Sequence, residues 1–91
     1  MYLRIADLRY REVINVCTGL RIGYVSDVQM DVVNGRIMAL VIPGRVRFFG
    51  LFGREDDYII PWENIRKMGS DIILTEIEGE YQREKRPKRP W

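Results

Sequence analysis

The alternation of apolar and polar residues predicts short β-strands along most of the chain. In residues 22–33, Val28, Met30 and Val32 alternate with polar side chains, which is the period-two pattern of a half-buried strand. Gly23, near the start of this run, indicates a bend or bulge. Residues 12–16 form a shorter β-branched run that ends at a Thr-Gly turn signal. Both runs therefore favour strands over helices.

The dipeptide Asn34-Gly35 is the strongest turn signal in the sequence. Both central residues of a type I′ turn need a positive φ angle, which Asn and Gly tolerate well. We therefore expect a two-residue turn that joins Val33 to Arg36, with the flanking runs paired as an antiparallel hairpin.

The strand that follows this turn, residues 37–42, is apolar on both faces. In an antiparallel sheet one face normally meets water. A helix, a loop, the C-terminal tail or another chain must then cover the second face. If another chain covers it, the protein is a homodimer, and Met38, Leu40 and Ile42 are its candidate interface residues.

The chain resumes a strand at residues 57–61 after a long insert. Pro61 fixes φ for one helical turn that begins at Trp62, a side chain that we expect to cover the core. Residues 3–10 are short and mixed, and they fit either a strand or a turn of helix.

The last apolar run, residues 72–77, places Ile73, Thr75 and Ile77 on one face of a strand. The chain thus holds five or six short strands, almost no helix, and a turn signal about every ten residues. This organisation predicts an all-β fold, either a small barrel or a sandwich.

The length and composition fit one small globular domain. A chain of 91 residues has a limited core. No apolar run approaches the ~18–20 residues that span a membrane. Arg4 and Asp7 interrupt the start of the chain, where a signal peptide would have its apolar region. The expected location is therefore the cytoplasm.

The positive charge is concentrated at the C-terminus. Residues 83–91 hold five Lys/Arg and one Asp/Glu, whereas residues 1–82 hold ten and twelve. We therefore expect a domain at 1–82 and an extended or disordered tail at 83–91 whose removal leaves the fold intact. The tail is either a solubilising extension or an electrostatic tether to an anionic membrane or nucleic acid.

The cysteine and histidine counts exclude several kinds of site. Cys17 is the one cysteine, and the sequence has no histidine. An internal disulfide, a zinc site built on Cys and His, and a catalytic triad with a histidine base are all excluded by these counts. We expect no enzyme activity and no cofactor.

Carboxylates occur in two places that could suggest a metal site. Glu55, Asp56 and Asp57 are consecutive, which is typical of a solvated strand entry because neighbours on a strand alternate faces. Asp27 and Asp31 share one strand face, but a calcium ion needs more oxygen ligands than this pair provides. We therefore expect no metal site.

Four motifs resemble those of a known family. The chain resembles the PRC-barrel superfamily and, within it, the YlmC/YmxH-type sporulation proteins of spore-forming Gram-positive bacteria. The general motif is Ile-Gly-x-Val-x-Asp at residues 22–27, with Asn-Gly-Arg-Ile at 34–37. The motifs typical of the sporulation group are Phe-Gly-Leu-Phe-Gly-Arg-Glu at 49–55 and Tyr-Ile-Ile-Pro-Trp at 58–62.

The resemblance covers residues 3–77 and stops before the tail. It implies an all-β fold, a small six-strand PRC-type β-barrel with a short helical turn. It also implies a non-catalytic adaptor role associated with sporulation, because relatives are typically docking modules and share no catalytic residue.

The insert between the two strands, residues 44–57, is the candidate partner-binding loop. Exposed aromatic side chains beside arginines are typical of protein interfaces. The candidate residues are Arg47, Phe48, Phe49, Leu51, Phe52 and Arg54.

Two other interpretations of this insert stay open. Its aromatic side chains could instead fold back and close one end of a barrel. Alternatively, the loop arginines and the basic tail could bind RNA or the ribosome, although the net negative charge of residues 1–82 argues against this. The partner protein has no predicted identity.

Overall fold

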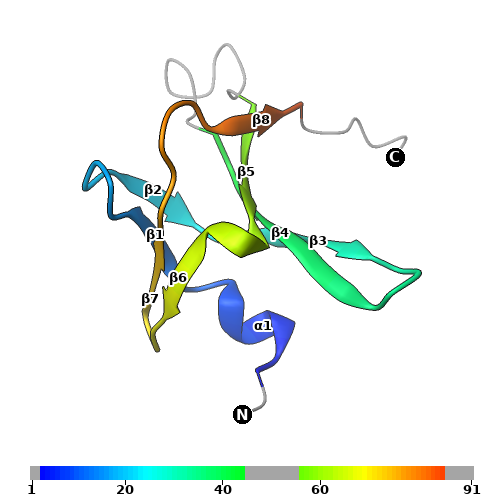
Figure 1. Ribbon diagram of the computed structural model, residues 1–91. Coiled ribbons are helices and arrows are strands. Elements are labelled where there is room, and N and C mark those ends of the chain that lie inside the picture. The colour runs from blue at the N-terminus through cyan, green and yellow to red at the C-terminus, as the bar shows by residue number, and fades with distance from the viewer. Residues whose placement is uncertain (1–2, 45–55, 86–91) are drawn as a thin grey trace, which may run out of the picture.

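The computed structural model describes residues 3–44 and 56–85, and strands dominate this part of the chain (Figure 1). The helical elements are α1 (Ile5–Leu8) and the 3₁₀ turn η2 (Trp62–Asn64). The strands are β1 (Glu12–Asn15), β2 (Arg21–Tyr24), β3 (Asp27–Asp31), β4 (Arg36–Ile42), β5 (Asp57–Pro61), β6 (Ile65–Met68), β7 (Ile72–Thr75) and β8 (Gln82–Glu84). The all-β prediction is confirmed, and so is the helical turn at Trp62.

The described strands form two four-stranded sheets, with the orders β2-β1-β7-β6 and β3-β4-β5-β8. The strand number is larger than the expected six, partly because the predicted run 22–33 divides into two strands. The break falls at Val25, which is buried, and it sends β2 and β3 into different sheets. In β2, Gly23 has a φ of +140°, so the expected irregularity is present.

Aliphatic side chains from both sheets fill the core. The buried cluster comprises Leu8, Val13, Val25, Leu40, Ile42, Ile60, Ile73 and Ile77. Ile73, Thr75 and Ile77, which the sequence places on one face, are all buried, so this face points into the core. Each aliphatic side chain buried in this way stabilises the fold by about 1.5–3 kcal/mol relative to an exposed one.

A buried asparagine joins the first sheet to the chain that leads into β8. The Nδ2 amide of Asn15 donates to the Ile77 carbonyl at 3.0 Å and to the Tyr81 hydroxyl at 2.8 Å. Its Oδ1 accepts from the backbone N–H groups of Cys17 and Ile77, each at 3.1 Å. All four hydrogen-bonding positions of this side chain are therefore used.

The Asn34-Gly35 hairpin is confirmed, but its turn differs from the expected one. Asp31 pairs with Arg36, so the loop holds the four residues 32–35 and is not a two-residue type I′ turn. The reason is the Asp31 carboxylate, which caps the loop. Its oxygens accept from the backbone N–H of Val33 at 3.0 Å and from the Asn34 amide at 2.7 Å. Gly35 completes the turn with a φ of +66°.

The second face of β4 is covered by the chain's own edge strands. Ala39 and Ile59 lie on this face, and both are buried. The Gln29 amide of β3 donates to the Glu84 carboxylate of β8 at 3.0 Å, although these strands are opposite edges of the sheet. The sheet must curl for these side chains to meet. The apolar second face therefore does not require another chain.

We expect the Asn15→Leu substitution to destabilise the fold strongly. It keeps the side-chain volume but leaves the buried N–H and C=O of Ile77 without their partner, at about 1–3 kcal/mol for each unpaired group. The measurement is the free energy of unfolding in urea. The matched control is Asn64→Leu, which removes one hydrogen bond to the Glu76 carbonyl in a half-buried site and should lose less. Equal losses in both variants would contradict the role given to Asn15.

We expect Asp31 to stabilise the hairpin in a pH-dependent way. The Asn34 side-chain amide, followed by the Asn34 backbone N–H, lowers the pKa of Asp31 from its ordinary value of 3.8. Because the folded pKa is below the unfolded one, this contribution is complete above the unfolded pKa and disappears as the pH falls through the folded pKa.

The test compares the urea midpoints of the wild type and Asp31→Asn at neutral pH and in strong acid. The wild type should be more stable at neutral pH, and the difference should vanish in acid. Asp27→Asn, an exposed change on the same strand, serves as the control. A stability difference that persists unchanged in acid would contradict the titration of Asp31.

Candidate functional site

The two ends of the predicted partner-binding loop lie side by side. Ile42 at the end of β4 pairs with Tyr58 near the start of β5, so the insert 44–57 leaves and rejoins the same end of one sheet. The candidate residues Arg47, Phe48, Phe49, Leu51, Phe52 and Arg54 lie outside the described residues. The structure therefore defines the base of this loop, which we call the loop base: Asp56, Asp57, Tyr58, Tyr81 and Arg83.

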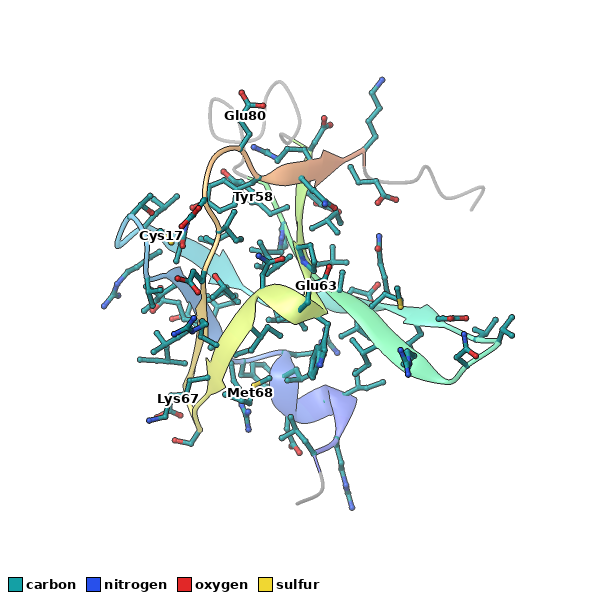
Figure 2. The ribbon with its side chains drawn as sticks, in the orientation of Figure 1. Cys17, Tyr58, Glu63, Lys67, Met68 and Glu80 are labelled. Atoms are coloured by element: carbon teal, nitrogen blue, oxygen red, sulfur yellow. The ribbon has the colours of Figure 1, made fainter. Side chains whose placement is uncertain are left out.

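Aromatic and cationic side chains hold the loop base together. The Arg83 guanidinium lies 3.9 Å from the centre of the Tyr58 ring, a cation–π contact. The Tyr58 and Tyr81 rings meet edge to face, with their centres 5.5 Å apart at 82°. Arg83 also donates hydrogen bonds to the Asp56 carbonyl. Figure 2 shows Tyr58 beside β8, the strand that carries Arg83.

Asp57 differs from the expected solvated strand entry, because its side chain is only 9% exposed. Asp56 is exposed as expected, and Glu55 lies outside the described residues. The reason is that β5 is an inner strand, flanked by β4 and β8, with Glu84 directly opposite Asp57. The polar sequence of β8 gives no local sign of a strand, so the sequence pattern does not indicate that this position is covered.

Two residues of the expected tail belong to β8. Arg83 and Glu84 pair with Tyr58 and Asp57, so ordered structure extends beyond the boundary set at residue 82. These polar side chains have no apolar pattern. Their positions depend on contacts made across the fold, which local sequence does not reveal.

We expect deletion of residues 83–91 to destabilise the domain and deletion of 86–91 to have little effect. The longer deletion removes the Arg83 cation–π contact and the Glu84–Gln29 hydrogen bond, a loss of about 1–2 kcal/mol. Thermal unfolding of the two truncated proteins measures the difference. If both melt like the full chain, β8 makes no contribution to stability.

The other end of β4 carries an open apolar groove of about 380 Å³. Arg36, Ile37, Met38, Trp62 and Glu63 line it. Met38 reaches the surface through a β-bulge: Gln29 pairs with Ala39 and Met30 with Ile37, so Met38 has no partner on β3. Trp62 is partly exposed in this groove and does not simply cover the core as expected.

The candidate dimer residues differ in their exposure to solvent. Leu40 and Ile42 are fully buried within the single chain, where they pack in the core, so they offer no surface to a second copy. Met38 is 48% exposed. The bulge explains the difference, since it turns Met38 away from the inward face that Leu40 and Ile42 share.

Cys17, Glu76 and Glu78 form the one cluster of potential metal ligands found among the described residues. Their donor atoms all lie within 4.8 Å of one another. Glu76 is already paired with Arg66 at 2.5 Å, and Cys17 is exposed. Three donors, one of them engaged in an ion pair, fall short of the four that a structural zinc site uses. Local sequence does not reveal this grouping, because the pairing of β1 with β7 brings together residues far apart in the chain.

Among residues 3–44 and 56–85, no helix has both the length and the apolar character needed to reach across a lipid bilayer.

The family model of the PRC-barrel domain matches residues 1–81. This chain belongs to the PRC-barrel family. The match includes the core, the hairpin and the loop base up to Tyr81, and it confirms the resemblance seen in the sequence motifs.

Relatives from spore-forming bacteria support the same assignment. The chain is 35% identical over 75 residues to the "Probable sporulation protein YlmC" of Bacillus subtilis, which covers 82% of this chain and 93% of the relative. It is 32% identical over 80 residues to the "Uncharacterized protein YmxH" of the same organism, covering 86% and 93%. A Clostridium acetobutylicum protein, "Uncharacterized protein CA_C1697", is 31% identical over 68 residues, covering 75% and 77%.

Proposed function

We propose that this protein is a non-catalytic PRC-barrel adaptor that acts in sporulation and docks a partner protein through the loop 44–57. The association with sporulation rests on the likeness to the B. subtilis protein whose name carries it. The docking role rests on the loop base and on the composition of the insert.

The observation that carries the proposal is the fixed loop base. Arg83 and Tyr81 pack on Tyr58, and Arg83 holds the Asp56 carbonyl next to the point where the insert rejoins β5. Binding residues are often found on loops that a rigid scaffold positions. A fixed base also lowers the conformational entropy that the loop loses when a partner binds.

The composition of the insert favours a protein partner. Phe48, Phe49, Leu51 and Phe52 stand within five residues, and burying each such side chain contributes about 2 kcal/mol. Aromatic residues and arginine are the types enriched at the centres of protein interfaces. The acidic excess of residues 1–82 gives little attraction for nucleic acid.

The side chains available for chemistry support a non-catalytic role. General acid–base catalysis uses paired groups within hydrogen-bond reach of one substrate atom. The sequence has no histidine. In the described residues, Cys17, Glu76 and Glu78 are the one group of three potential metal ligands, and Glu76 is held in an ion pair with Arg66.

We expect the double substitution Phe49→Ala/Phe52→Ala to abolish partner capture while the domain stays folded. The change removes two aromatic side chains from the loop and leaves the loop base intact. The measurement is affinity capture from a lysate of a sporulating culture, followed by calorimetric binding of the captured protein after purification. The control is Leu3→Ala/Ile5→Ala, an apolar double change at exposed residues at the N-terminal end of the described chain, outside the loop base.

Two outcomes would contradict this proposal. A melting temperature lowered by more than a few degrees in the Phe49/Phe52 variant would identify these side chains as core residues. Capture that disappears after nuclease treatment of the lysate would favour the RNA- or ribosome-associated alternative.

A further inference from the structure

The β3–β4 hairpin exposes apolar side chains beyond the body of the fold. Val32 and Val33 at its tip are 87% and 88% exposed. Figure 1 shows the tip of the hairpin projecting away from the rest of the fold. The Asp31 cap and the turn at Gly35 fix the shape of this tip, so two β-branched side chains are held in water on an ordered loop.

The groove beside the hairpin is apolar and could therefore bind a tip of this kind from another molecule. Ile37, Met38 and Trp62 contribute its apolar surface, and Arg36 and Glu63 line it as well. Neither Arg36 nor Glu63 makes an ion pair with any residue in the part of the chain that the structure describes. The groove thus presents an apolar strip, one cation and one anion, all available for contact.

We propose that a second copy of this chain occupies the groove and forms a two-fold symmetric dimer. The dimer patch consists of Val32, Val33, Arg36, Met38, Trp62 and Glu63. In a two-fold interface the same patch meets itself, so each feature must find its complement within the patch. The tip of each hairpin packs on the Met38–Trp62 strip of the other copy, and Arg36 of each copy faces Glu63 of the other.

The paired charges favour a second copy of this chain over a foreign partner. A surface that carries one cation and one anion is complementary to itself when a two-fold axis passes between them, so a second copy supplies both opposite charges without any other partner. Burial of the exposed valines, Met38 and Trp62 supplies the apolar contribution. The rim charges fix the orientation.

The dimer leaves the loop bases free. The hairpin precedes β4 and the loop follows it, and seven residues of strand separate them by about 20 Å. The dimer proposal therefore stands independently of the partner-docking role. If both hold, each dimer presents two loops, and a partner with two binding sites gains avidity.

The test is a charge exchange followed by sedimentation equilibrium over a range of concentrations. Arg36→Glu alone places two acidic residues at each rim contact, and Glu63→Arg alone places two basic ones. Each variant should dimerise at least about tenfold more weakly than the wild type. An equimolar mixture of the two variants restores both contacts and should dimerise like the wild type. Lys67→Glu, an exposed charge reversal on β6 away from Glu63 (Figure 2), is the control.

A fluorescence measurement reports on the same contact. The sequence has two tryptophans, so the full-length Trp91→Phe variant leaves Trp62 as the single emitter. Its emission should shift to shorter wavelength as the concentration rises through the dimerisation range.

A wild type that remains monomeric at all accessible concentrations would overturn the proposal. So would a dimer that is unaffected by either charge reversal, or a mixture of the two variants that fails to associate while each variant keeps the wild-type melting temperature.

Discussion

The hydrogen bonds of Asn15 fix the position of the two sheets of this small domain relative to each other. The residue ends β1 in one sheet, and its side chain fixes Ile77 and Tyr81 on the segment that leads to β8 in the other. A core of a few aliphatic residues cannot by itself set the path of a polar segment such as 78–81. A buried side-chain amide whose hydrogen-bonding positions are all satisfied can set this path, because any other path would leave the amide without partners.

The consequences of this constraint extend to the loop base. Asn15 donates to the Tyr81 hydroxyl, and the Tyr81 ring packs against the Tyr58 ring. The Arg83 guanidinium stacks on Tyr58 and donates to the Asp56 carbonyl. Each contact is modest alone, at about 0.5–1.5 kcal/mol for an aromatic pair. Together these contacts connect a buried residue of β1 in one sheet to the loop base in the other.

The sequence predicts those parts of the fold that depend on local pattern. The Asn34-Gly35 hairpin and the face shared by Ile73 and Thr75 belong to this class, because turn residues and period-two alternation act over a few residues. β8 does not, since a Gln-Arg-Glu segment has no apolar face and becomes a strand by pairing with β5. The groove at Met38 also escapes prediction, because a bulge and the distant Trp62 create it together.

The position of β4 separates the hairpin from the loop base. Its middle residues, such as Leu40, are fully buried, and it pairs with β3 on one side and β5 on the other. A strand held in this way is rigid, so the hairpin before it and the loop after it keep a fixed separation. The apolar side chains at the hairpin tip can then stay exposed without weakening the core, because the residues that stabilise the fold lie elsewhere along the strand.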